Sequence, residues 1–583
     1  MAVELSTGTA EEQIAYFTME VALDDALPTF SGGLGVLAGD VLRSAADLEA
    51  PFAAVSLLWR EGYFHQLLDD SGHQIEEPVT WSPEDLLERL SVRVEVEVAG
   101  RRVQVGCYRY VIHGVTGGEV PVHFLDTDLE ENAPEDRRIT DRLYGGDAAH
   151  RLAQEAVLGL GGPAMLEALG IEPKVFHMNE GHSALLTLAL LEADAGSEPG
   201  GAGFSEAAVA ALGQRCVFTT HTPVAAGHDV FPVALVKEVL GDTRRAELEA
   251  LGQLGSGVLN MTELGMSHSR YVNGVSLRHR AVAQALAPTH HVESVTNGVH
   301  LATWAAPVFS SLFDEHVPGW RSDNAVLRYV SGVSLEEIGD AHGRAKATLL
   351  AEVARRSGRR LDPAALTIGL ARRATPYKQT ALLFSDLDRL RAIASSVGPI
   401  QVLCAGKAHP ADEPGKALIV TITQAAKTLG GDVEVLFLPD YSLALAKLLC
   451  SGTDLWLNTP IKPLEASGTS GMKAAVNGVP SLSTLDGWWI EGCIEGITGW
   501  AIGGLDNGDD AEALYRVLGE AVAPLYYGSP ERYRAVMRYA ISLNASFFHT
   551  ERVVLEYERN AYRPAPGPRA VEPGRTIQQP RRP

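Results

Sequence analysis

Short apolar runs alternate along the chain with helical patterns and glycine-rich joints, and this alternation predicts α/β layers built on parallel sheets. Residues 173–194, PKVFHMNEGHSALLTLALLEAD, read as a buried strand, a polar loop and a helix. In residues 215–228, RCVFTTHTPVAAGH, a short β-branched and aromatic run again ends in a polar loop. The glycine-rich residues 195–205 predict a loop.

A second series of strands begins after Trp304, with the runs ALTIGLARR, IQVLCAG, VEVLFLPDY and TDLWLNT, each followed by a polar turn and a helical pattern. Two such series predict two doubly wound, Rossmann-like domains that face a cleft, with ligands at the carboxyl ends of the strands. We expect an N-terminal domain over residues 1–305 and a C-terminal domain over residues 306–562, whose last helices pack back on the first domain. Residues 563–583 are rich in proline and arginine and predict a disordered tail.

Composition narrows the class of protein. A chain of 583 residues is long enough for two or more cores. A net charge of −24 argues against nonspecific nucleic-acid binding. The five cysteines are scattered without a paired spacing, and the first residues do not have the pattern of a signal peptide. No apolar run approaches the length of a membrane span, so we expect a cytoplasmic protein.

Basic residues gather where the run ALTIGLA ends. Arg372 and Arg373 follow it directly, Thr375 and Pro376 are suited to the N-cap and first position of a helix, and Lys378 comes next. Guanidinium groups match phosphate geometry, so this cluster at a helix N-terminus predicts an anion site. A solvated basic turn is the alternative. The run QVLCAGKAH adds Lys407 and His409 at the next strand end.

The segment EASGTSGMKAAVNG, residues 465–478, places one lysine just inside a helix that starts on a bare loop. Gly468 and Gly471 permit backbone conformations closed to other residues, and the small side chains let a ligand approach the peptide N–H groups. The helix start is therefore a candidate anion cradle, although the spacing is not that of a P-loop. A flexible turn with a solvated Lys473 is the alternative.

Other polar motifs are less specific. SGGLG, residues 31–35, opens a helix but lacks the full dinucleotide-binding pattern. The spacing of the histidines in HMNEGH, residues 177–182, disfavours a zinc site, and we expect no metal. His221 follows a strand and is placed to touch a ligand. No carboxylate pair of the glycosidase type is evident, so any reaction must find its proton donor elsewhere.

Nine blocks of this sequence together resemble the glycogen/α-glucan (maltodextrin) phosphorylases of the compact bacterial and archaeal type. They include YFTMEVALDDALPTFSGGLGVLAGD, HMNEGHSALL, TTHTPVAAGHDVF, VTNGVHLATW, ARRATPYKQ, AGKAHPADEPGK and NTPIKPLEASGTSGMKAAVNG, in the family's order, and span about residues 14–560. The resemblance implies the GT-B arrangement of two Rossmann-like domains and a pyridoxal 5'-phosphate cofactor. It also implies reversible phosphorolysis of α-1,4-glucan from the non-reducing end, with retention, to glucose 1-phosphate. In that reaction the cofactor phosphate shuttles a proton to inorganic phosphate, which protonates the glycosidic oxygen in place of the missing acid.

The resemblance also assigns individual residues. Lys473 resembles the lysine that forms the Schiff base with the cofactor, and its ammonium form is expected to be disfavoured by the helix end and by neighbouring cations. The other implied cofactor ligands are Thr469, Ser470, Arg372, Tyr441, Trp304 and Asn458. Arg373 and Lys378 resemble the pair that holds the substrate phosphate, assisted by the backbone at Gly32 and Gly33. The implied glucose contacts are Glu465, Ser467, Gly468, Asn297, His221 and Tyr377.

Two departures from the family pattern fall near the anion site. Gln379 stands where arginine is common, and Asp440 stands where asparagine is usual, and both are expected to weaken phosphate binding. The regulatory extension of the long phosphorylases is not seen, so we expect an enzyme without allosteric control, which a large activation by AMP would contradict. A homodimer is implied by resemblance alone. A sugar-nucleotide glycosyltransferase of the same architecture and a non-catalytic glycan-binding relative remain as alternatives.

Overall fold

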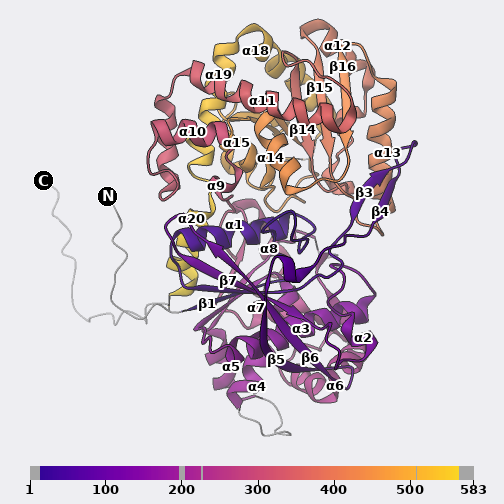
Figure 1. Ribbon diagram of the computed structural model, residues 1–583, viewed down its shortest axis with the longest axis vertical. Coiled ribbons are helices and arrows are strands. Elements are labelled where there is room, and N and C mark those ends of the chain that lie inside the picture. Colours follow the sequence, from indigo (N-terminus) through magenta and orange to yellow (C-terminus); the bar gives the residue numbers. More distant parts are fainter. Residues whose placement is uncertain (1–12, 196–203, 225–226, 507, 564–583) are drawn as a thin grey trace, which may run out of the picture.

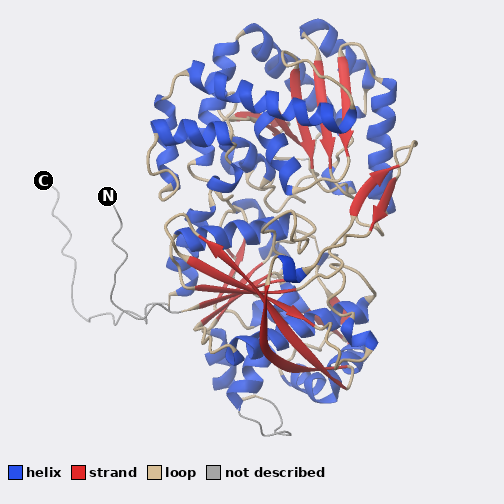
Figure 2. Ribbon diagram, viewed as in Figure 1, coloured by secondary structure: helices blue, strands red, loops and turns tan. Residues whose placement is uncertain are grey.

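The computed structural model describes residues 13–195, 204–224, 227–506 and 508–563, which form two α/β lobes stacked one on the other (Figure 1). Helices surround the strands of both lobes (Figure 2). Most of the loop expected at 195–205, and all but the first residue of the tail expected at 563–583, lie outside the described residues. Within the described ranges no helix is both long and apolar enough to cross a membrane.

The first lobe is built on a nine-stranded sheet in the order β13-β12-β9-β8-β1-β2-β7-β6-β5, parallel except that β6 runs antiparallel to β5 and β7. Its strands are β1 (Ile14–Thr18), β2 (Phe52–Leu57), β5 (Glu88–Val98), β6 (Arg101–His113), β7 (Glu119–Asp126), β8 (Val175–Asn179), β9 (Cys216–Thr219), β12 (Tyr271–Gly274) and β13 (Glu293–Ser294). From β1 the chain winds first toward β2 and later toward β8. The carboxyl ends of β1 and β8 therefore mark the switch point where a ligand cleft is expected.

The helices of the first lobe include the two that the sequence predicts. SGGLG opens α1 (Gly33–Asp47), and the run after HMNEGH forms α4 (Leu186–Ala195) behind β8, so the strand–loop–helix reading of 173–194 is confirmed. The others are α2 (Pro134–Arg137), α3 (Ala148–Ala168), α5 (Glu206–Gly213), α6 (Val233–Ala250), α7 (Met261–Ser267) and α8 (Leu277–Leu286). A small sheet pairs β10 (Val230–Pro232) with β11 (Val258–Asn260).

The second lobe is built on six parallel strands in the order β16-β15-β14-β17-β18-β19. They are β14 (Leu366–Ala371), β15 (Ile400–Ala405), β16 (Val433–Leu438), β17 (Leu455–Asn458), β18 (Ser481–Thr484) and β19 (Gly499–Ile502). In chain order this is 3-2-1-4-5-6, the strand order of the dinucleotide-binding Rossmann fold, with its switch point between β14 and β17. The four strands predicted after Trp304 are β14 to β17, which confirms the doubly wound fold.

The remaining α-helices of the described residues cover this second sheet or join the two lobes. They are α9 (Leu301–Trp304), α10 (Pro307–His316), α11 (Leu335–Ser357), α12 (Leu387–Val397), α13 (Glu413–Thr428), α14 (Leu443–Gly452), α15 (Ser470–Val476), α16 (Trp489–Gly492), α17 (Asp510–Val517), α18 (Ala523–Gly528), α19 (Pro530–Tyr539) and α20 (Thr550–Tyr557).

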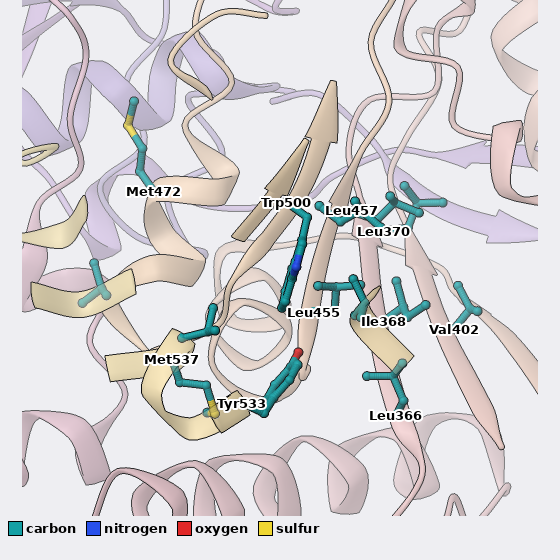
Figure 3. Close-up of a cluster of buried hydrophobic side chains, with 14 of the residues drawn as sticks. Leu366, Ile368, Leu370, Val402, Leu455, Leu457, Met472, Trp500, Tyr533 and Met537 are labelled. Carbon is teal, nitrogen blue, oxygen red and sulfur yellow. The ribbon is translucent and has the colours of Figure 1, made fainter. Parts of the chain in front are cut away.

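The core of the second lobe holds the two switch-point strands in place. Alternate residues of β14 and β17, drawn with Val402 of β15 in Figure 3, point to one face of the sheet. Trp500, Tyr533 and Met537 belong to the same cluster, and all of these side chains are at least 95% buried. Each fully buried side chain of this size contributes roughly 1.5–3 kcal/mol. The strand ends that carry the polar residues are thus rigidly supported.

Two segments tie the lobes together. The final helix α20 returns to the first lobe and lies against α1, where Ser44 and Thr550 share a hydrogen bond of 2.7 Å between their hydroxyl oxygens (Figure 1). On the other side, the hairpin of β3 (His65–Leu68) and β4 (Gln74–Glu77) reaches from the first lobe to the second. Its buried Gln66 and Gln74 donate amide hydrogens to the carbonyl oxygens of Gly406 and Ala408, at 3.0 and 2.9 Å.

Glu551, at the start of α20, makes folding stability depend on pH. Its carboxylate accepts the Asn324 backbone N–H at 2.8 Å, and burial, with Asp323 and Asp47 nearby, raises its pKa to about 7 from the ordinary 4.5. Ionisation therefore costs the folded state more than the unfolded state, and this cost appears as pH rises from 4.5 to 7. We expect Glu551→Gln to raise Tm by about 1–3 °C at pH 8 but not at pH 4.5, by calorimetry. An equal gain at both pH values would contradict this assignment.

Candidate active site

The predicted cations lie at the switch point of the second sheet. Arg372 and Arg373 follow β14 directly, and Lys378 ends the short 3₁₀ turn Pro376–Lys378. The prediction of an α-helix that starts at Thr375 is wrong. The Thr375 side chain caps no helix, and the left-handed backbone of Gln379 (φ 46°) ends the short turn after Lys378. The next α-helix, α12, begins only after Asp386, whose side chain caps it. These cations therefore gather around a strand end without help from a helix dipole.

Glu465 is the centre of this cluster. Its carboxylate oxygens accept hydrogen bonds from Arg372 Nη2 at 2.7 Å and from Lys378 Nζ at 2.6 Å. Burial alone would raise the pKa of Glu465, but Lys378 and Arg372 outweigh burial and keep the pKa below its ordinary value. The carboxylate is thus ionised at neutral pH, and one anion already balances part of the positive charge.

Several buried polar atoms around this ion cluster lack a hydrogen-bond partner among the described residues. They are Arg372 Nε, Ser467 Oγ, Gln379 Oε1 and Thr380 Oγ1. A buried polar atom without a partner costs free energy, so native proteins keep few of them. Their concentration beside Arg372 and Lys378 marks a place where a polar ligand would satisfy groups that the protein leaves open.

The loop that follows Glu465 leads directly to Lys473. Gly468 has a left-handed backbone (φ 82°), and a Cβ there would lie 3.3 Å from Glu465 Cγ, so a larger residue would be strained. Residues from Ser470 onward form the seven-residue helix α15, and Ser470 Oγ accepts a hydrogen bond from Trp456 Nε1 at 3.1 Å. The loop is therefore held close to the end of β17.

Lys473 is buried rather than solvated. Its side chain lies in α15 with 8% of the residue exposed, and its Nζ sits 4.2 Å from the centroid of the Trp304 ring. Burial lowers the pKa of the Lys473 ammonium, whereas Asp40 and Cys450 oppose that shift. The direction matches the sequence-based expectation, but its cause does not: removal from water, rather than neighbouring cations, disfavours the charged form.

Other predicted residues surround Lys473 and the strand ends. Trp304 is 1% exposed, and its Nε1–H donates to Asp40 Oδ2 at 2.8 Å. Asn458, the last residue of β17, is buried. Tyr441 precedes α14 and packs against the core, and burial raises its pKa above the ordinary value. These residues form predominantly apolar surroundings for an amine whose pKa is lowered by burial.

The glycine loop of the first lobe meets the cations of the second. A Cβ added to Gly32 would lie 2.8 Å from Arg373 Nη2, so a larger residue would require the Arg373 guanidinium to move. Arg373 Nη2 also lies 3.4 Å from Ser31 Oγ. Gly33, the first residue of α1, has open space where its Cβ would be. The two lobes thus bring Gly32 and Arg373 together, although the two residues lie 341 positions apart in the chain.

Three of the predicted glucose contacts lie in neighbouring loops. His221 Nε2 and Asn179 Oδ1 are 2.6 Å apart, and burial lowers the pKa of His221 to about 3, so its ring is neutral. Asn297 is buried, and its backbone carbonyl accepts from Arg552. Tyr377 lies under Lys378, whose Nζ is 4.8 Å from the ring centroid. Within the described ranges, His221 and Asn297 have no direct polar contact with Glu465.

The sequence analysis did not identify the carboxylates that hold these loops in place. Glu20 Oε2 accepts the backbone N–H groups of Ser31 and Gly32, at 2.6 and 3.2 Å. Asp486 Oδ2 accepts the backbone N–H of Glu465 at 2.8 Å. Glu180 accepts the backbone N–H of His221 at 2.7 Å. Glu20 and Glu180 each follow a buried strand, which is the signal that could have identified them.

The two departures from the family pattern have defined surroundings. Asp440 Oδ1 lies 2.8 Å from Lys407 Nζ, which also donates to the Phe64 carbonyl oxygen. Lys407 is therefore already neutralised and adds little to the cation cluster, contrary to the sequence-based expectation. Gln379 lies beside Lys378, and its backbone carbonyl accepts from Thr459 Oγ1 at 2.9 Å.

The fold and site define a two-domain α/β protein of the GT-B type. Each of its two lobes has a largely parallel sheet with a switch point, and the cation cluster lies between the lobes.

A model of the family described as carbohydrate phosphorylase matches residues 228–497. The chain is 37% identical to the maltodextrin phosphorylase of Thermococcus litoralis, over 95% of this chain and 70% of that protein. It is 36% identical to the glycogen phosphorylase of Mycobacterium tuberculosis, over 95% and 71% of the two chains. Identity to the glycogen phosphorylase of Aquifex aeolicus is 33%, over 95% and 86%. The chain belongs to the carbohydrate phosphorylase family.

Proposed function

We propose that this protein is a pyridoxal-phosphate-dependent α-1,4-glucan phosphorylase. It splits the terminal α-1,4 bond of glycogen or maltodextrin with inorganic phosphate, so that glucose 1-phosphate and a glucan shorter by one glucose result. The observation that carries this proposal is the buried Lys473, whose pKa burial lowers, eight residues beyond a carboxylate that accepts hydrogen bonds from two cations. Names of the relatives support the substrate class.

The residues around Lys473 fit the cofactor. A neutral amine attacks an aldehyde, and the pKa of Lys473 is shifted in that direction. Trp304 lies against the amine and also lines a cavity of about 170 Å³ between the lobes. When bound, the cofactor supplies a phosphate group that relays a proton to the substrate phosphate. We assign the cofactor ligands to Lys473, Thr469, Ser470, Arg372, Tyr441, Trp304 and Asn458.

Arg373 and Lys378 are our candidates to hold inorganic phosphate, together with the backbone at Gly32 and Gly33. A dianionic phosphate competes with Glu465 for these cations, because charge-assisted hydrogen bonds to a dianion are stronger than those to a carboxylate. Phosphate binding would then release oxygens of Glu465 to accept sugar hydroxyl groups. The bound phosphate donates a proton to the glycosidic oxygen and then attacks the anomeric carbon, so that the leaving glucan departs as an alcohol.

Glucose is assigned to the surrounding loops. Besides Glu465, the proposed contacts are Ser467, Gly468, Asn297, His221 and Tyr377. Ser467 Oγ is buried without a partner within the described ranges, which suits a sugar hydroxyl. His221 is held through Asn179 as a neutral ring, so it acts as a hydrogen-bonding group and not as an acid.

The remaining assignments rest on the fold and on resemblance. We propose two domains that divide near residue 305, because the strands of the nine-stranded sheet end at Ser294 and those of the six-stranded sheet begin at Leu366. The five cysteines are free, which supports a cytoplasmic location. A homodimer is proposed by resemblance, and light scattering of the purified chain tests it.

Borohydride reduction of the reconstituted protein tests the cofactor assignment. We expect one pyridoxyl group per chain, found by peptide mass mapping on Lys473. The chain is then supplied with maltodextrin and either inorganic phosphate or a sugar nucleotide. Glucose 1-phosphate formed only with phosphate supports the proposal. Transfer only from the sugar nucleotide would instead show a glycosyltransferase, and cofactor on Lys473 without turnover a non-catalytic relative.

Asp486 gives the proposed reaction a pH dependence. Burial raises the pKa of Asp486 to about 6, so its carboxylate, which positions the Glu465 backbone, becomes protonated as pH falls below 6. We expect kcat/KM for maltodextrin to fall on that side of the profile. Asp486→Asn should lower kcat/KM about tenfold at pH 7.5, the value of one charge-assisted hydrogen bond, and should remove this acid limb. If the variant kept the wild-type acid limb, Asp486 would not be its origin.

A further inference from the structure

Helix α20 carries an arginine that binds the backbone of a segment in the first lobe. Arg552 lies in the first turn of α20, and its side chain is 13% exposed. Its Nη2 donates to the carbonyl oxygens of Thr296 at 2.5 Å and of Asn297 at 3.2 Å. A guanidinium is planar and its donors have fixed directions, so the carbonyl groups that it binds are fixed as well. Arg552 therefore holds the segment that carries Asn297, a proposed glucose contact.

The guanidinium of Arg552 is itself held in place by its neighbours in α20. Its Nε donates to the Phe547 carbonyl oxygen at 2.7 Å, and its Nη1 pairs with Glu556 Oε1 at 2.8 Å. The guanidinium carbon also lies 4.8 Å from the centroid of the Phe547 ring. Fixing so long a side chain costs conformational entropy, which these contacts offset. They direct Nη2 at the two carbonyl groups and away from solvent.

The start of α20 also pairs with the backbone of the same segment. The Val299 N–H donates to the Phe548 carbonyl oxygen, and the Thr550 N–H donates to the Val299 carbonyl oxygen, both at 3.1 Å. A Cβ added to Gly298 would lie 2.3 Å from the carbonyl carbon of His549, so glycine permits this close approach of two backbones. The start of α20 and this segment therefore form one hydrogen-bonded unit.

Asn297 is held through its backbone. Its N–H donates to the Val275 carbonyl oxygen at 3.1 Å, and its carbonyl oxygen accepts from Arg552. One residue earlier, Thr296 Oγ1 donates to Glu491 Oε2 at 2.8 Å. Asn297 is only 4% exposed, and within the described ranges no hydrogen bond joins its side-chain amide to another residue. That amide, which can both donate and accept, is therefore available to a sugar hydroxyl.

We propose that Arg552 is a positioning residue for the glucose pocket and that it acts through Asn297. The inference rests on the proposed function, in which Asn297 contacts the terminal glucose. Arg552 fixes the carbonyl groups on both sides of the Asn297 α-carbon, and thereby the direction of its side chain, without contacting the sugar. A displacement of about 1 Å at a substrate contact can cost about 100-fold in rate. The last helix of the described chain thus takes part in sugar recognition.

A double-mutant cycle tests whether Arg552 acts through Asn297. Rates are measured for the wild type, Arg552→Met, Asn297→Ala and the double variant, with glucose 1-phosphate and maltodextrin in the direction of synthesis. We expect Arg552→Met to lower kcat/KM for glucose 1-phosphate about tenfold, but by less than about twofold once residue 297 is alanine. The KM for inorganic phosphate in phosphorolysis should stay within about twofold of the wild-type value, because the proposed phosphate contacts lie elsewhere.

Two further variants make the result specific. Arg538→Met is the matched control, because Arg538 of α19 also donates to a backbone carbonyl, that of Val333 at 3.0 Å, and lies over the Tyr539 ring. It should leave kcat/KM for glucose 1-phosphate within about twofold of the wild-type value. Arg552→Lys keeps the charge and a donor, so it should recover part of the loss. If Arg552→Met fails to fold, the cycle of Arg552→Lys with Asn297→Ala decides in its place.

The outcomes separate this inference from the proposed function. If the wild type catalyses phosphorolysis but the losses from the two single variants multiply in the double variant, the positioning role alone is overturned. Equal losses in Arg552→Met and Arg538→Met would also overturn it, because they would show a general effect of removing a partly buried guanidinium. A wild type without phosphorolysis of any α-glucan would overturn both proposals.

Discussion

Lys473→Ala is expected to lose the cofactor and at least about 10³-fold of the phosphorolysis rate, the largest effect of any single substitution in this chain. The Lys473 amine is the group that we propose attaches the cofactor, and within the described ranges no other lysine Nζ lies over the Trp304 ring. Cofactor content is measured by its absorbance after alkaline release, and activity by glucose 1-phosphate formed from maltodextrin.

A matched control for Lys473→Ala is Lys447→Ala, which removes a lysine from the cavity that Trp304 lines without touching the attachment point. The control should retain one cofactor per chain. Retention of cofactor and activity by Lys473→Ala would refute the assignment. Thermal unfolding of both variants shows whether truncation of a buried side chain has damaged the fold.

Lys378→Ala is expected to reduce kcat/KM for phosphate by on the order of 10²–10³, because it removes a fixed cation from the proposed meeting place of the two phosphates. The side chain is only 14% exposed and lies 2.6 Å from Glu465, so its charge acts with little screening by water. Initial rates at varied phosphate and saturating maltodextrin measure this effect.

Lys407→Met provides the comparison for Lys378→Ala. Lys407 also follows a strand of the second sheet, but Asp440 neutralises it at 2.8 Å, so kcat/KM for phosphate should change by less than about fivefold. Comparable losses in the two variants would mean that the overall positive potential matters and that Lys378 has no specific role.

The sequence predicts the sheet of the second lobe well for a physical reason. Strands that are covered on both faces need nearly continuous apolar runs, and the buried strands in ALTIGLA and IQVLCA are such runs, whereas VEVLFL forms the half-buried edge strand. Their carboxyl ends then place Arg372 and Asn458 at one edge of the sheet. The strands β5 and β6 were missed, although ERLSVRVEVEV alternates as a half-exposed strand does.

The details of the site depend on contacts that no local pattern encodes. Thr375-Pro376 is a good helix start, yet the left-handed Gln379 ends the turn after Lys378. Glu465 lies 87 residues beyond Lys378 in the chain, so its ion pair could not be deduced from spacing. For Asp40, by contrast, the sequence does indicate a buried partner, because a carboxylate within an apolar helical run needs one.

Phosphate-dependent release of glucose 1-phosphate by the purified, reconstituted chain tests the central claim most directly. With maltodextrin and inorganic phosphate, we predict one glucose 1-phosphate for each glucose lost from the non-reducing ends, no product without phosphate, and none from the Lys473→Ala variant. Absence of phosphorolysis from every α-glucan tried, in a protein shown to carry cofactor on Lys473, would contradict the proposed function.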